Sequence, residues 1–177
     1  MKRKVAAWLA LGIITLVAGL LLASANELTK NIIVAQNEQA AQAARQRLLP
    51  AATEFVAQED ASGTLDNLFT AKAGDETVGS VAQITTQGFG GPIEIIVGMD
   101  AQGAITGISV GGASFKETAG LGAKTKDGKF TDQFAGKQAP LALGTDIDAV
   151  TAATISSRAV TEAVNRAVEV MYAKRIE

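Results

Sequence analysis

The sequence predicts an α+β protein, in which an N-terminal transmembrane helix precedes a domain with a twisted antiparallel sheet packed by a C-terminal helix. Residues 5–23 form an apolar run without a charged residue. All but two of the 18 glycines lie between Gly63 and Gly144, where they separate short runs rich in Val, Ile and Thr, as in strands joined by turns. Near the C-terminus, apolar residues recur at helical spacing.

The composition limits the chemistry that the chain can perform. With 177 residues, 47% hydrophobic and 19% charged, the chain can bury a core, which excludes a disordered protein. Its net charge of −2 argues against nucleic acid as a partner. The absence of Cys and His excludes disulfides, thiolate nucleophiles, Cys/His metal centres and a Ser-His-Asp triad. We therefore predict no catalytic residue and no metal site, and any redox chemistry requires an organic cofactor.

The apolar run at 5–23 has the length of a membrane-spanning helix, because 19 residues rise about 28 Å. Basic residues at 2–4 precede it, so the positive-inside tendency predicts a single-pass cell-membrane protein with a cytoplasmic N-terminus and an extracytoplasmic main domain. The alternative is a cleaved signal peptide, because residues 23–25 read A-S-A. The length of the run favours a retained anchor, and either interpretation places the rest outside the cytoplasm.

The sequence pattern divides the chain into three predicted parts. Residues 26–49 are rich in strong helix formers, and Pro50 ends the helical pattern. We therefore expect a cytoplasmic tip and transmembrane helix over 1–25, a helical stalk over 26–50, and the extracytoplasmic domain over 51–177.

Short runs rich in Val, Ile and Thr between glycines in the middle of the chain predict strands. Residues 78–87 form one expected strand, and residues 93–99 and 104–110 form a hairpin around a four-residue turn. A shorter strand is expected around Leu141 and Leu143. Residues 111–129 are rich in glycine and polar residues, which predicts a long flexible loop of the kind that often carries function.

The C-terminal segment predicts a helix that packs on the sheet. Its apolar stripe consists of Ala159, Val160, Ala163, Val164, Ala167, Val168 and Met171. Ser156 and Ser157 are expected N-cap residues, and a helical turn is expected over 130–134. Neither Gly-rich stretch, at 88–92 or 120–125, fits a nucleotide-binding motif.

Small and hydroxyl residues converge at 146–158, where this helix begins. A helix N-terminus suits a phosphate, and Arg158 lies one helical turn beyond Thr154, where it could add a charge-assisted contact. From the residues alone, ordinary helix capping is the alternative.

Four sequence blocks resemble one family. D-A-V-T-A-A-T at 148–154 resembles the Asp-x-x-Ser/Thr-Gly-Ala-Ser/Thr flavinylation motif of the FMN-binding domains in RnfG, from the Rnf complex, and in NqrC, from the sodium-pumping quinone reductase. K-E-T-A-G-L-G-A-K at 116–124 is similar to that family's Glu-Thr-Pro-Gly-Leu-Gly loop, and F-T-D-Q-F-A-G-K at 130–137 matches its next block. G-F-G-G-P-I at 88–93 resembles its hairpin entry. With the N-terminal span, the likeness covers nearly the whole chain.

The resemblance implies that a flavin transferase esterifies the Thr154 hydroxyl with the phosphate of FMN. Aromatic stacking on the flavin is expected from Phe89 or Phe115, with Leu121 packed on the ring. The cofactor-binding residues that we expect are Asp148, Thr151, Ala153 and Arg158 at the motif, and Glu117, Thr118, Gly120, Leu121 and Gly122 in the loop.

Two residues depart from the family pattern. Ala152 replaces the glycine of the motif, which costs on the order of 1 kcal/mol if the backbone φ is positive there and little otherwise. Ala119 replaces the proline of the loop, which loosens it.

The resemblance also implies a function. The chain is expected to be a non-autonomous electron-transfer subunit that carries FMN in the Rnf complex, which couples electron transfer between ferredoxin and NAD to Na⁺ or H⁺ translocation. Its expected partners are the other membrane subunits of that complex and a flavin transferase during maturation. The alternatives are an NqrC-like protein, a stand-alone anchored flavoprotein, and a non-redox binding module with a degenerate motif.

Overall fold

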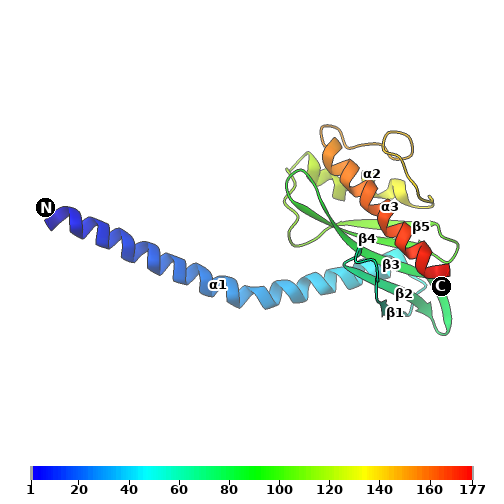
Figure 1. Ribbon diagram of the computed structural model, residues 1–177, viewed down its shortest axis with the longest axis horizontal. Coiled ribbons are helices and arrows are strands. Elements are labelled where there is room, and N and C mark those ends of the chain that lie inside the picture. Colours follow the sequence, from blue (N-terminus) through cyan, green and yellow to red (C-terminus); the bar gives the residue numbers. More distant parts are fainter. Residues whose placement is uncertain (1, 177) are drawn as a thin grey trace. The chain divides into compact units, whose positions relative to one another are not determined.

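The computed structural model describes residues 2–176, with the side chains of all of these except 2–6, 31 and 176. Along the described chain, a long helix is followed by five strands, several short helical turns and a final helix (Figure 1). The chain divides into two compact units, one that extends to Gln39 and one that begins at Ala40. This order of elements confirms the predicted α+β class.

Helix α1, Lys2–Leu48, is continuous through the apolar run and the segment after it. Every described side chain from 7 to 39 is exposed, including Trp8, Leu16 and Leu22. Among the described residues, α1 is the one helix long and apolar enough to cross a membrane. The side chains of the basic residues at 2–4, which carry the predicted orientation, lie outside the described residues.

The sheet is an antiparallel meander in which each strand pairs with its neighbours in sequence. The predicted strand at 78–87 and the predicted hairpin are confirmed, and two further strands precede them. The five strands are β1 Glu54–Gln58, β2 Asn67–Ala73, β3 Glu76–Gln87, β4 Pro92–Asp100 and β5 Ile105–Gly111.

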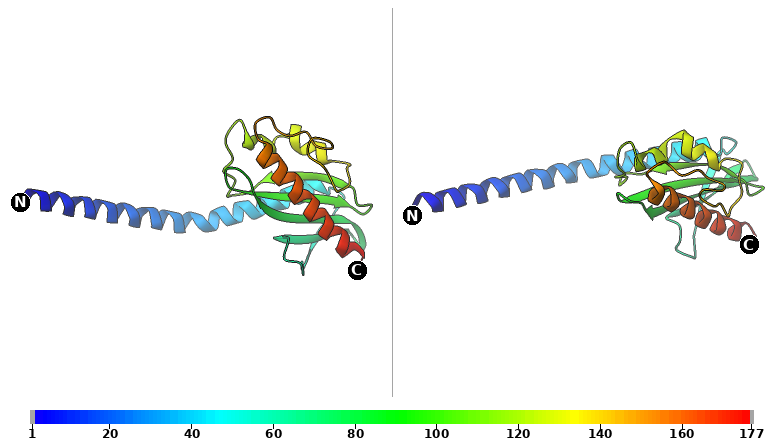
Figure 2. Two further views of the ribbon diagram at one scale, coloured as in Figure 1. Left: turned by 45° about the horizontal axis from the view of Figure 1, so that its top comes forward. Right: turned by 90° about the horizontal axis from the view of Figure 1, so that it is seen from above.

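Helix α3, Thr154–Ile176, crosses one face of the sheet, against β3 and β4 (Figure 2). Alternate residues of β4 face it, among them Ile95 and Val97, whereas Ile96 belongs to a separate cluster on the opposite face. The predicted apolar stripe of α3 is buried, including Val160 and Val164. Because each fully buried Val contributes roughly 1.5–3 kcal/mol, this layer holds α3 firmly in place.

The last turns of α1 cover the opposite face of the sheet. Ala41 and Ala44 are buried there in one cluster with Val81 and Ile96. The end of α1 lies close to β4 and β5 because Gly98 and Gly107, which pair across these two strands, carry no side chain. A Cβ built on Gly98 would lie 2.8 Å from the Cβ of Leu48, and one built on Gly107 would lie 3.1 Å from Leu48 Cδ2.

The segment between the sheet and α3 differs in two respects from the prediction. The expected flexible loop at 111–129 contains a 3₁₀ helix, η1 Gly122–Lys126, and the beginning of α2, Gly128–Thr131. With η2, Asp132–Phe134, α2 confirms the expected helical turn at 130–134.

The expected strand around Leu141 and Leu143 is wrong, because only an isolated bridge joins Leu143 to Ile147. The chain reverses tightly here instead of extending. The N–H of Asp146 donates to the carbonyl of Ala142 at 2.8 Å, and the Asp146 carboxylate accepts the N–H of Ala142 at 2.7 Å.

We predict that Gly98→Ala lowers the free energy of unfolding by about 1–3 kcal/mol, because the new methyl group would clash with Thr106 Oγ1 and with Leu48 Cβ. Chemical denaturation of the full chain in detergent, followed by circular dichroism, measures the loss. Gly111→Ala is the matched control, because the nearest atom to a Cβ there, apart from the adjacent residues, is 3.6 Å away in the Lys126 side chain. Equal stability of wild type and Gly98→Ala would contradict the close packing.

Candidate functional site

The candidate site is built around the first residue of α3, Thr154, whose side chain is exposed. The chain enters the helix through a turn in which the N–H of Ala153 donates to the carbonyl of Val150 at 2.9 Å. Ala152 is the third residue of this turn, and its φ is +60°, the one positive φ outside glycine among the described residues. The motif therefore requires here the backbone conformation that glycine adopts most readily.

The two serines that follow do not cap the helix, so that prediction is wrong. The helix begins earlier, at Thr154, and both hydroxyls accept hydrogen bonds from neighbouring segments. Ser156 Oγ accepts the N–H of Phe89 at 3.4 Å, and Ser157 Oγ accepts the N–H of Val150 at 3.0 Å. The serines thus tie the start of α3 to the hairpin entry and to the motif itself.

A cavity of about 390 Å³ opens beside Thr154, within the size range of small-molecule sites. Phe89, Leu121 and Ile155 line it and are 71%, 42% and 59% exposed. Among the described residues beyond α1, these are the large apolar side chains left exposed. The complete lining of the cavity is Phe89, Glu117, Thr118, Leu121, Gly122, Ala152, Ala153, Thr154, Ile155 and Ser156.

Glu117 joins the loop at 116–124 to the hairpin entry at 88–93. Its Oε1 atom accepts the N–H of Gly90 at 3.1 Å. Its carboxylate also occupies the space where side chains on Gly88 and Gly122 would lie, so a larger residue at either position would displace Glu117. In the same loop, the carbonyl of Thr118 accepts the N–H groups of Leu121 and Ala123, each at 3.1 Å, and this turn places Leu121 at the cavity.

Side chains of the block at 130–137 hold the backbone of the motif and of the residues just before it. Gln133 Oε1 accepts the N–H of Asp148 at 2.7 Å, and Gln133 Nε2 donates to the carbonyl of Asp148 at 3.3 Å. Lys137 Nζ donates to the carbonyl of Asp146. The block is itself fixed to β5, because Ile105 exchanges backbone hydrogen bonds with Gly136 and Lys137 at 2.7 and 2.8 Å.

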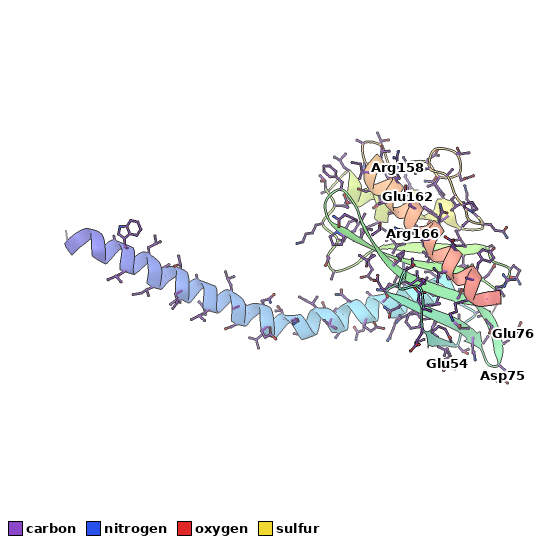
Figure 3. The ribbon with its side chains drawn as sticks, in the orientation of Figure 1. Glu54, Asp75, Glu76, Arg158, Glu162 and Arg166 are labelled. Atoms are coloured by element: carbon purple, nitrogen blue, oxygen red, sulfur yellow. The ribbon has the colours of Figure 1, made fainter. Side chains whose placement is uncertain are left out.

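The structure brings most of the predicted site residues together. Those that line the cavity are Thr154, Ala153, Glu117, Thr118, Leu121 and Gly122. Arg158 instead borders, with Thr154, an adjoining depression of about 490 Å³. Figure 3 shows Arg158 on α3, with Glu162 and Arg166 further along the same helix. Asp148, Thr151 and Gly120 are exposed and do not line either hollow.

Three residues that line the cavity are absent from the predicted cofactor-binding residues. They are Ala152, within the motif, and Ile155 and Ser156, which directly follow it. Of the two phenylalanines expected to stack on the flavin, one lies at the cavity. Phe115 packs on the main core, with Lys126 Nζ 4.7 Å from the centre of its ring. Phe89 is therefore the phenylalanine at the cavity.

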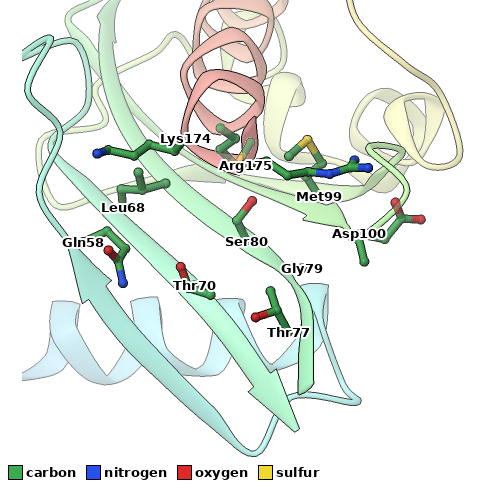
Figure 4. Close-up of a pocket in the computed structure, with 12 residues that line it drawn as sticks. Gln58, Leu68, Thr70, Thr77, Gly79, Ser80, Met99, Asp100, Lys174 and Arg175 are labelled. Carbon is green, nitrogen blue, oxygen red and sulfur yellow. The ribbon is translucent and has the colours of Figure 1, made fainter. Parts of the chain in front are cut away.

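A second cavity, of about 410 Å³, lies at the other end of α3 (Figure 4). Its lining includes Thr70, Ser80, Lys174 and Arg175, none of which belongs to the four sequence blocks. At about 1.5 Å of rise per residue, α3 separates Lys174 from Thr154 by roughly 30 Å. This cavity is therefore not part of the candidate site.

The fold and the site define an FMN-binding domain, since residues 88–169 match the family of that description. The chain is 36% identical to the G subunit of the Na⁺-translocating ferredoxin:NAD⁺ oxidoreductase complex of Acetobacterium woodii, over 92% of this chain and 88% of that protein. It is 31% identical to the G subunit of the ion-translocating oxidoreductase complex of Escherichia coli, over 83% of this chain and 81% of that protein. The chain belongs to the RnfG family, which these G subunits represent.

Solved structures share the fold at lower identity. NqrC of Parabacteroides distasonis, from a Na⁺-translocating NADH-quinone reductase, has a TM-score of 0.57 and 19% identity, and the match covers 80% of this chain and 94% of that chain. NqrC of Shewanella oneidensis has a TM-score of 0.51 and 17% identity, over 72% and 73% of the two chains. These likenesses show a common architecture.

We predict that Ala152→Gly raises the free energy of unfolding by about 1 kcal/mol, because glycine adopts φ +60° without the steric penalty of a Cβ. Thermal and chemical denaturation of the full chain in detergent measure the gain. Ala135→Gly is the control, because Ala135 is exposed with φ −62°, so the same exchange there lowers stability. A loss of stability in Ala152→Gly would contradict the strained turn.

Proposed function

We propose that this chain is the flavin-carrying electron-transfer subunit of an ion-translocating ferredoxin:NAD⁺ oxidoreductase complex, with FMN bound covalently to Thr154. One observation carries the proposal. The exposed Thr154 lines the same cavity as the loop of Glu117 and Leu121, although the two segments lie far apart in sequence. The first residues of α3 also offer backbone N–H groups that have no acceptor within the helix, a favourable setting for a phosphate.

The attachment is a phosphoryl transfer without change of oxidation state. The Thr154 oxygen forms a bond to the flavin-bearing phosphorus of a flavin phosphoanhydride such as FAD. The anhydride P–O bond breaks, AMP leaves with the bonding electron pair, and the hydroxyl proton passes to a base of the transferase. The product is FMN held as a phosphoester, which prevents loss of the cofactor by dilution.

The residues of the chain would then hold and shield the cofactor. Phe89, Leu121 and Ile155 supply apolar surface for a planar ring system, and Glu117 fixes the loop that faces it. Arg158 borders the adjoining depression next to Thr154, where its positive charge would stabilise the phosphate. FMN, when attached, supplies reversible electron acceptance, whereas the protein supplies position and surroundings.

We further propose the membrane arrangement from the sequence pattern. Residues 1–25 comprise a cytoplasmic tip and a membrane anchor, 26–50 a helical stalk, and 51–177 the extracytoplasmic domain. The exposed apolar side chains of α1 support the anchor, and the basic residues at 2–4 support the orientation. A covalent flavin suits such a location, because a domain outside the cytoplasm has no access to the cytoplasmic FMN pool.

The RnfG assignment is favoured over an NqrC-like one by sequence, because the match to the A. woodii protein covers 92% of this chain at 36% identity. We predict that the tagged chain, purified from native membranes in mild detergent, brings down integral-membrane subunits of one complex, which proteomics identifies. Recovery of the chain alone would contradict a role in a complex and favour a stand-alone flavoprotein.

We predict that Thr154→Ala abolishes covalent flavin, because it removes the attacking oxygen, whereas Thr154→Ser retains it. The measurement is intact mass and in-gel flavin fluorescence after coexpression with a flavin transferase. Thr145→Ala is the control, because Thr145 is an exposed threonine of the same loop outside the motif. Fluorescence that persists in Thr154→Ala would show that the attachment site is wrong.

A further inference from the structure

We infer that Gln133 is a positioning residue for flavin attachment, because its side-chain amide fixes the backbone of Asp148, the first residue of the attachment motif. The inference rests on the proposed modification of Thr154. It adds that the transferase acts on a motif already shaped by the folded domain, and that Gln133 maintains this shape from outside the motif.

The contact is a two-point clamp. Gln133 Oε1 accepts the N–H of Asp148 at 2.7 Å, while Gln133 Nε2 donates to the carbonyl of the same residue at 3.3 Å. The Nε2 group also donates to the carbonyl of Lys129 at 3.0 Å, which orients the amide from its own helical turn. A side chain that serves a backbone N–H and C=O together needs both a donor and an acceptor, and a primary amide supplies both.

Other residues of the motif are also held through hydrogen bonds to their backbone groups. Ser157 Oγ accepts the N–H of Val150, and the Val150 carbonyl accepts the N–H of Ala153. By contrast, the side chains of Asp148, Thr151 and Thr154 are exposed. A segment with a fixed backbone and exposed side chains presents a defined shape to a second protein at low entropic cost.

This arrangement separates two modes of recognition. An enzyme that reads the motif as an extended peptide would be indifferent to Gln133, which lies 15 residues before Asp148. An enzyme that reads the folded shape binds only the fraction of molecules in which the motif is ordered. Loss of the clamp lowers that fraction, so it raises the apparent KM while the chemical step stays unchanged.

A matched control exists on the same loop. Asn165 Oδ1 accepts the N–H of Leu141 at 2.8 Å, and Asn165 Nδ2 donates to the Leu141 carbonyl at 2.9 Å. This second amide clamp fixes the loop seven residues before Asp148, outside the motif. Removal of either clamp costs two hydrogen bonds to the loop backbone, and removal of Gln133 also costs its bond to the Lys129 carbonyl, so a general loss of stability affects both variants.

The test measures the kinetics of flavin transfer to the full-length apo chain in detergent, with FAD and the flavin transferase, followed by intact mass. For Gln133→Met we expect a rise in KM for the apo chain of about tenfold with kcat within about twofold of wild type. Asn165→Leu should keep both constants within about twofold. Gln133→Glu, which retains an acceptor for the Asp148 N–H, should lie between wild type and Gln133→Met.

Three results would overturn the inference: wild-type kinetics in Gln133→Met, an equal rise in KM in Asn165→Leu, or a synthetic peptide of residues 146–158 that is modified as efficiently as the full chain. If Gln133→Met does not fold, the KM values of Gln133→Glu and Asn165→Leu are compared instead. A higher KM in Gln133→Glu alone supports the inference, and equal values overturn it. If the wild-type chain itself acquires no flavin on Thr154, the proposed attachment fails instead.

Discussion

The burial of the apolar stripe of α3 against β3 and β4 determines where every part of the candidate site lies. Because the helix is fixed along its length, its first residue has a fixed position relative to the hairpin entry at Gly88 and the loop at Glu117. The exposed Thr154 and the exposed apolar side chains of Phe89 and Leu121 then face one hollow. The chemistry of the site therefore depends on packing that takes place away from it.

The site itself is built with little regular secondary structure. Between Gly136 and Thr154 the chain has turns and an isolated bridge, and side chains from other segments hold its backbone. Gln133 and Lys137 hold the motif and the residues just before it from one side and Ser157 holds the motif from α3, while Asn165 holds the preceding loop outside the motif. Ala152 retains an unfavourable φ within this segment. Strain of this kind persists where the surrounding contacts determine the conformation, which is common at functional sites.

The sequence predicts the elements whose signals are local. The apolar runs of β4 and β5, which are joined by a short turn, and the helical stripe of α3 are strong patterns, so these three elements can be predicted. Strands β1 and β2 escape prediction because their short, partly exposed sequences lack a clear alternation. The family motif locates Thr154, but the amide clamp of Gln133 joins residues without periodic spacing, so only the folded structure reveals it. The predicted start of α3 is too late because serines in its first turn resemble caps.

The central claim is that the Thr154 oxygen carries FMN in the mature protein. Intact mass of the chain purified from its native membranes, followed by peptide mapping, tests it most directly. We predict a mass increase of one FMN less one water, confined to the peptide that contains Thr154. An unmodified chain, or flavin attached to another residue, would contradict it.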